Sequence, residues 1–265
     1  MTTSQPRDPA ADATPLPEPE EPAAFLPAVP RHRWGFGAFL LVEAVLLSTA
    51  AFVSVLVGDT GPGPLPMRVV LLGTMLPTMI AAGVAVLITY VRGNGPVVDL
   101  RIEWRWADVK TGFRYGCVGL VFTTLAAYLW TRLVGDANAT SAISSLVEDR
   151  RMSVSAAVVM FVYLWLLGPI CEEIIYRGLL WGAAEQLQWR SERWGRVAAF
   201  LLCTAVFAAS HLEPLRTTLL LVIAVPIGLA RLVTGRLPAS IVAHQVNNFL
   251  PALTILLGAL GVASF

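Results

Sequence analysis

Long apolar stretches separated by short polar loops constrain the fold of this chain more than any other feature. Most are long enough for a helix, rising about 1.5 Å per residue, to cross a hydrocarbon core about 30 Å thick. Charged residues make up only 14% of the chain, against about a quarter in soluble domains, so water is not expected to be its sole solvent. The sequence predicts an all-α polytopic membrane protein, a bundle of seven or eight transmembrane helices. The stretches are residues 35–57, 67–91, 112–134, 154–186, 196–212, 216–234 and 238–262.

Two of these stretches leave the number of spans open. The stretch at 154–186 is too long for one upright span, and we expect it to kink at Gly168-Pro169. Pro251 interrupts the last stretch, so a turn near Asn247-Asn248 would divide it into two short spans. We favour seven spans and keep eight as the alternative.

The distribution of basic residues predicts the orientation in the membrane. Cytoplasmic loops are enriched in Lys and Arg, and here one set of loops, which includes the N-terminal tail, holds 13 of them against 4 in the other. We therefore expect a cytoplasmic N-terminus and, with seven spans, a C-terminus outside. The richer set is Arg7, Arg31, Arg33, Arg92, Arg101, Arg105, Lys110, Arg114, Arg190, Arg193, Arg196, Arg231 and Arg236; the other is Arg68, Arg150, Arg151 and Arg216.

Composition suggests three regions and a cellular setting. Residues 1–33 are rich in Pro, Ala, Glu and Asp and poor in large apolar residues, which predicts a disordered cytoplasmic tail. Residues 34–150 are expected to form N-terminal transmembrane helices, and 151–265 a second transmembrane region. Arginine outnumbers lysine 18 to 1, which we interpret as a GC-rich bacterial genome and hence a bacterial plasma membrane. The net charge of +1 gives no reason to expect nucleic acid as a partner.

One cluster of ionisable residues lies within the stretch at 154–186. Charged groups in hydrocarbon are costly, so they usually face a cavity and serve a function. Glu173 and Arg177 are four residues apart on one helix face, in the order that favours an ion pair. Glu172 is turned about 100° away and has no local cation, which leaves it available for chemistry. The alternative is a helix end that emerges into the headgroups with solvated charges.

Two further polar clusters lie in later stretches. One ends in His211, four residues after Phe207, and the other pairs His244 with Asn248 on one helix face. Each alone is explained by an interfacial residue or by a hydrogen bond between helices. Counted from the expected cytoplasmic helix ends, Glu172 and His211 lie at similar depth and His244 and Asn248 somewhat shallower, so all four can converge if the helices tilt.

These residues resemble the pattern of the CPBP family, which includes type II CAAX prenyl endopeptidases and bacteriocin-processing proteins. The family pattern is Glu-Glu-x-x-x-Arg, Phe-x-x-x-His and His-x-x-x-Asn or Asp, and the likeness covers about residues 160–255. The resemblance implies that residues 151–265 form a CPBP-like catalytic transmembrane region. It also implies an intramembrane peptidase acting on a membrane-associated or lipidated protein or peptide. It implies that Glu172 and His211 activate water and that His244 and Asn248 stabilise the oxyanion. Glu173, Arg177 and Phe207 would then support the site.

The need for a metal and the catalytic activity itself have alternatives. Glu172, His211 and His244 could bind zinc with water in the open position, but there is no His-Glu-x-x-His and no evident carboxylate orients either histidine. We therefore favour a metal-free glutamate mechanism without a cofactor. The second functional class is a non-catalytic immunity or transport factor that keeps the fold. Glu43, in the first stretch, is the residue that the peptidase interpretation explains least.

Overall fold

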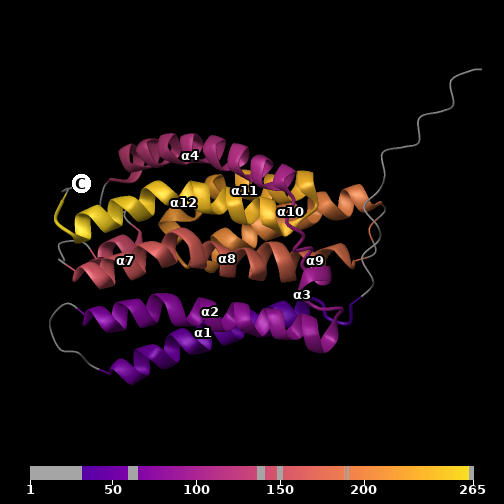
Figure 1. Ribbon diagram of the computed structural model, residues 1–265, viewed down its shortest axis with the longest axis horizontal. Coiled ribbons are helices and arrows are strands. Elements are labelled where there is room, and N and C mark those ends of the chain that lie inside the picture. The colour runs from indigo at the N-terminus through magenta and orange to yellow at the C-terminus, as the bar shows by residue number, and fades with distance from the viewer. Residues whose placement is uncertain are drawn as a thin grey trace, which may run out of the picture.

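The computed structural model is a bundle of helices whose long axes run nearly parallel (Figure 1). It describes residues 32–58, 65–135, 141–147, 152–187, 189 and 191–262, and within them it contains no strand. Residues 1–31 of the predicted tail lie outside the described residues. The elements are α1 (Phe36–Val57), α2 (Met67–Arg92), α3 (Pro96–Asp99), α4 (Trp106–Val134), α6 (Ala142–Val147), α7 (Val154–Val162), η2 (Tyr163–Leu167), α8 (Gly168–Glu173), η3 (Ile174–Leu180), α9 (Trp181–Glu185), α10 (Glu192–Ser210), η4 (Pro214–Arg216), α11 (Thr217–Thr234) and α12 (Leu237–Ala259).

Six helices in the described part of the chain are long and apolar enough to cross a membrane, one fewer than the seven stretches predicted. The exception is α10, the stretch at 196–212. Glu192, Arg193 and Arg196 occupy its first turns, so its uncharged part covers only about 21 Å of the roughly 30 Å that a span needs. The protein is an integral membrane protein with an all-α fold, as predicted.

Successive long helices nevertheless run in alternating directions, α10 included. One end of the bundle is tied by backbone hydrogen bonds from Arg33 to Arg92 and from Leu237 to Arg101. At the opposite end, where Figure 1 marks the C-terminus, Met152 donates to the carbonyl of Ala259. The division of the last stretch into two spans is wrong, because α12 continues through Pro251 without a turn.

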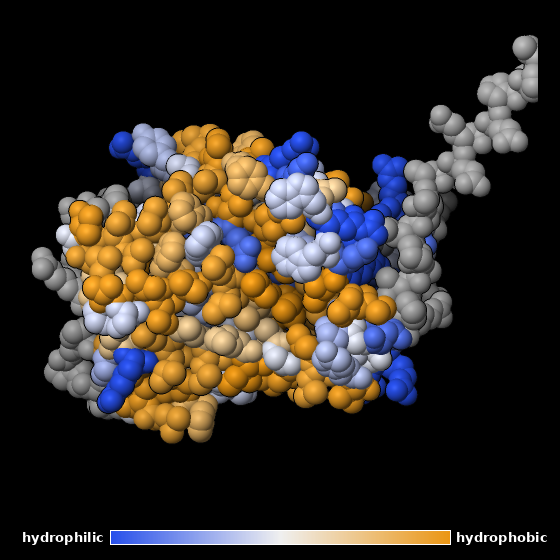
Figure 2. Space-filling view, in the orientation of Figure 1, coloured by the Kyte–Doolittle hydropathy of each residue, from blue (hydrophilic) through white to orange (hydrophobic). Residues whose placement is uncertain are grey.

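The surface of the bundle is mostly apolar. Figure 2 shows hydrophobic residues over most of the visible face, with most hydrophilic residues near the two ends. Large side chains such as Phe52, Val121 and Phe122 are more than half exposed. In water such an area would drive association, whereas lipid tails solvate it without cost. The distribution therefore fits a bundle that lipid surrounds between two polar ends.

The long stretch at 154–186 forms one continuous helical run of 32 residues that contains two π segments, η2 and η3. The expected kink at Gly168-Pro169 coincides with the end of η2, and Pro169 lies in the first turn of α8. Proline lacks an N–H and its ring crowds the carbonyl four residues earlier. The wider turn of η2, which ends directly before Gly168, accommodates this crowding.

Glycines of α4 allow it to lie against α12 and α11. A Cβ atom on Gly112 would lie 2.4 Å from the carbonyl oxygen of Ala239, and one on Gly116 would lie 2.6 Å from Cβ of Val246. On Gly119 it would lie 2.8 Å from the ring of Pro226. Small residues of this kind let membrane helices approach closely enough for dispersion contacts to hold them together.

We expect Gly116→Ala to destabilise the protein by about 1–3 kcal/mol, because the added methyl group would push α4 away from α12. Thermal melts in detergent measure the loss. Gly83→Ala on α2 is the matched control, since a Cβ there meets nothing within 4 Å. Equal melting temperatures for the two variants would contradict the close approach.

The orientation stays a prediction, and reporter fusions test it. A fusion after Pro62 and one after Phe265 are both expected to report from outside the cytoplasm, because the described bundle has seven long helical runs of alternating direction when the shorter α10 is included. A cytoplasmic signal from the fusion after Pro62 would show that the true orientation is the opposite of the predicted one.

Candidate active site

A buried ion pair lies at the centre of the bundle, as the i, i+4 spacing predicted. Arg177 Nη1 donates to Glu173 Oε1 over 2.9 Å, and both side chains are 0% exposed. The second guanidinium nitrogen, Nη2, lies 3.4 Å from the carbonyl of Ala224 on α11. Because neither charge reaches solvent, each depends on the other for compensation. The alternative of solvated charges at a helix end is wrong for this pair.

Glu173 also orients the histidine of α12. His244 Nδ1 lies 2.9 Å from Glu173 Oε1, so the ring donates its Nδ1–H to the carboxylate. The other ring nitrogen, Nε2, is 3.7 Å from Glu172 Oε2. The expectation that no carboxylate orients either histidine is therefore wrong for His244. The orienting residue is 71 positions away in the chain, so no local pattern could reveal it.

The histidine at the end of α10 has a defined tautomer. His211 Nδ1 lies 2.7 Å from the carbonyl of Phe207, and since a carbonyl only accepts, Nδ1 carries the proton. In the neutral ring, Nε2 then keeps its lone pair. His211 is exposed at the C-cap of α10, and Glu172 is partly exposed, with 26% of its side chain accessible. The imidazole that contacts Glu172 is that of His244 rather than His211.

Phe207 connects both histidines to the ion pair. Its ring centroid lies 4.7 Å from that of His211 and 5.7 Å from that of His244, both edge-to-face. The guanidinium carbon of Arg177 lies over the same ring, 4.4 Å from its centroid. The Phe207 ring thus contacts both histidines at its edge or face, and a cation–π interaction with Arg177 holds the ring in place.

The polar face of α12 meets backbone carbonyls of the π segment η2. Asn248 Nδ2 lies 3.3 Å from the carbonyl of Leu164, and Gln245 Nε2 lies 3.3 Å from that of Leu166. One amide hydrogen of Asn248 is therefore engaged, while the other is available for a ligand. Asn247 instead faces α4, where Thr123 donates to it over 3.0 Å.

The residues do not fit a metal ion as they are arranged. Among the residues that the structure describes, no group of three or more His, Cys, Asp or Glu side chains lies close enough to hold one. Of the alternative zinc ligands, Glu172 and His244 are neighbours, but His211 does not complete a set with them. We therefore derive no catalytic step through a metal.

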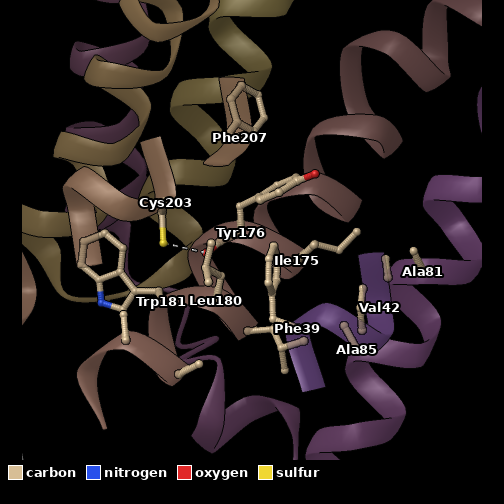
Figure 3. Close-up of a cluster of buried hydrophobic side chains, with 14 of the residues drawn as sticks. Phe39, Val42, Ala81, Ala85, Ile175, Tyr176, Leu180, Trp181, Cys203 and Phe207 are labelled. Carbon is tan, nitrogen blue, oxygen red and sulfur yellow. Dashed lines mark hydrogen bonds between the residues drawn. The ribbon is translucent and has the colours of Figure 1, made fainter. Parts of the chain in front are cut away.

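Two residues beside the site were not assigned a role from the sequence. Tyr176 packs edge-to-face on Phe207, with ring centroids 5.4 Å apart, and on Phe39 of α1 at 6.1 Å (Figure 3). The carboxyl group of Glu43, also on α1, lies beside the Tyr176 hydroxyl. The signal for Glu43 was present in the sequence, because α1 contains no other ionisable residue.

Comparison with protein families matches part of the chain to a known family. Residues 154–250 match the family model described as type II CAAX prenyl endopeptidase Rce1-like, a family of proteases. The matched range runs from α7 into α12, and it contains every residue of the site described above except those of α1 and α4. No curated protein and no solved structure matches the chain.

Removing either partner of the buried pair should impair folding. We expect Glu173→Gln and Arg177→Leu each to cost about 3–5 kcal/mol, because each leaves the opposite charge uncompensated. The double variant should lose less than the sum of the single losses. Thermal melts of all three proteins in detergent provide the measurement, and strictly additive losses would mean that the two side chains are not coupled.

Proposed function

Because the Rce1-like segment at 154–250 identifies the chain as an intramembrane protease of the CPBP family, we propose that it hydrolyses a peptide bond of a membrane-associated or lipidated substrate at Glu172 and His211. The observation that carries the proposal is the chain of contacts Arg177–Glu173–His244–Glu172. It ends on a carboxylate that, among the described residues, has His244 but no Lys or Arg within ion-pair distance. Amide hydrolysis needs such a base for water and donors for the oxyanion.

The base is Glu172, with His211 holding the water. Glu172 lies on α8 between two π segments, partly exposed while its neighbour Glu173 is buried. Its carboxylate takes the proton as the water oxygen attacks the scissile carbonyl. His211 donates Nδ1–H to the carbonyl of Phe207. Its Nε2 accepts a hydrogen bond from the second O–H of the water and so holds the water in place. After the tetrahedral intermediate forms, Glu172 returns its proton to the leaving amine, so the carboxylate is regenerated.

The oxyanion is stabilised by His244 and Asn248, which lie four residues apart on α12. Donation by His244 requires a proton on Nε2, and with Nδ1–H bound to Glu173 this form is the imidazolium. The carboxylates of Glu173 and Glu172 offset its charge. Asn248 contributes the amide hydrogen that Leu164 does not use. Both donors are positioned before the reaction, so little reorganisation is needed when charge develops on the oxygen.

The substrate class follows from the surroundings of the site. Glu172 and His211 are the accessible members, and the protein around them is an apolar bundle in the bilayer. A substrate must therefore enter from lipid or carry an apolar or lipid anchor. The family description names prenylated substrates, and for this chain we propose only the wider class of membrane-associated or lipidated proteins and peptides.

We also propose that the reaction proceeds without a metal or other cofactor. The hydrogen-bond partners of the two histidines support this proposal. Glu173 orients His244 as a hydrogen-bond donor, and the carbonyl of Phe207 orients His211 as a hydrogen-bond acceptor. Turnover that survives dialysis against a strong chelator is the expected result. Loss of turnover that added zinc restores would favour the zinc alternative.

A non-catalytic transport or immunity factor remains the second candidate, because carboxyl groups without a cation also mark ion pathways in membranes. The test is Glu172→Gln, which keeps the shape and removes the base. Substrates are identified by mapping new protein termini in membranes that contain wild-type protein or a deletion, and turnover is then measured with purified protein.

We expect Glu172→Gln to lower turnover about 10²–10⁴-fold with unchanged melting temperature, and His211→Ala to do the same. Glu192→Gln makes the same chemical change at an exposed position and should retain full turnover. Wild-type turnover in Glu172→Gln would show that Glu172 is not the base. If the protein termini mapped in membranes are the same with and without this protein, the transport or immunity function is favoured.

A further inference from the structure

Glu43 brings a third carboxyl group to the site from a helix outside the Rce1-like segment. It lies on α1 directly after Val42, which is 0% exposed, and it is the only ionisable residue of that helix. One carboxylate oxygen, Oε1, is buried and has no hydrogen-bond partner among the described residues. A charged or protonated carboxyl group at this position is costly in an apolar surrounding. An apolar side chain would fill the same space without that cost.

Two routes connect Glu43 to the residues proposed to activate water. Its carboxyl group lies beside the hydroxyl of Tyr176, and it interacts electrostatically with His211. Ser210, the residue before His211, also lies beside the Tyr176 hydroxyl. Tyr176 in turn packs on Phe207, whose carbonyl holds His211 Nδ1–H. Nδ1 of His211 thus faces the carbonyl of Phe207, while the exposed ring lies near enough to Glu43 to interact with it.

We propose that Glu43 is a positioning residue that holds Tyr176 and fixes His211 with Nε2 toward the attacking water. The carboxyl group anchors the Tyr176 hydroxyl, and the ring of Tyr176 keeps Phe207 in place. The carboxylate also attracts the imidazole ring and so favours a single orientation of that ring. In a surrounding of low dielectric constant this attraction is larger than in water. The proposal rests on the proposed function, because it assigns His211 the role of holding water.

The first helix therefore contributes to the reaction and does not only cover the protease segment. Figure 3 places Phe39 and Val42 of α1 on the side of Tyr176 opposite Phe207, so α1 supports the tyrosine from behind. A purely structural role would use the same packing, through Phe39 and Val42 alone. The test must accordingly report on His211 itself.

The chain has only three histidines, which allows a direct measurement. Histidine labelled with ¹⁵N in the full-length protein gives signals from His32, His211 and His244, assigned by single His→Gln variants. In Glu43→Gln we expect the ring nitrogen signals of His211 to shift, whereas those of His32, at the far end of the bundle beside Trp34, stay in place. Unchanged His211 signals in a folded Glu43→Gln protein would overturn the proposal, whatever happens to turnover.

Kinetics provide a second readout. Glu43→Gln should lower kcat about tenfold with little change in KM, since the substrate is bound as before and only the water is misplaced. Glu43→Asp, which keeps the charge, should recover part of the loss. Ser48→Ala removes an exposed polar group from the same helix and should be neutral. Equal losses for Gln and Asp, or a loss confined to KM, would count against positioning of His211.

Tyr176→Phe serves if Glu43→Gln does not fold. It keeps the ring on Phe207 and removes the hydroxyl that Glu43 contacts. A shift of the His211 signals in Tyr176→Phe supports the proposal, and its absence overturns it. The spectra need no substrate, so they test the position of His211 even if the protein is not a peptidase. In that case the His211 signals would still depend on Glu43, while Glu172→Gln would leave the mapped protein termini unchanged.

Discussion

The buried ion pair between Glu173 and Arg177 is the interaction on which the site depends. Arg177 also contacts a carbonyl of α11 and the ring of Phe207 on α10, while Glu173 binds His244 of α12. Four helical segments that are distant in sequence thus meet at one pair of charges. In a bilayer the attraction between helices cannot come from the exclusion of water, so contacts of this kind determine which faces meet.

The pair also separates support from chemistry within two adjacent residues. Glu173 is fully buried and neutralised by Arg177, whereas Glu172 is partly exposed and contacts only an imidazole among the ionisable groups within ion-pair distance. A helix turns its successive side chains by about 100°, so neighbouring acids of identical chemistry face different surroundings. One therefore maintains the architecture, and the other can exchange a proton with water.

Much of this arrangement was predictable from the sequence, because it depends on periodicity and on the cost of charge in hydrocarbon. The i, i+4 spacing predicted the pair of Glu173 with Arg177, and the long apolar stretches predicted the bundle. The bond between Glu173 and His244 was not predictable, since it requires the relative rotation of two helices. The sequence also contained the reason why α10 is too short to count as a span. Its first turns are charged, which leaves too few apolar residues to cross the bilayer.

The two π segments have a consequence for the direction in which the acids point. A π turn holds one residue more than an α turn, so each such turn rotates the helix beyond it by about 100° relative to the helix before it. With η2 before α8 and η3 after it, the short segment that carries Glu172 and Glu173 is offset in angle from both of its flanks. The flanks can therefore keep the faces that pack against their own neighbours, while the acids are aimed independently toward α12.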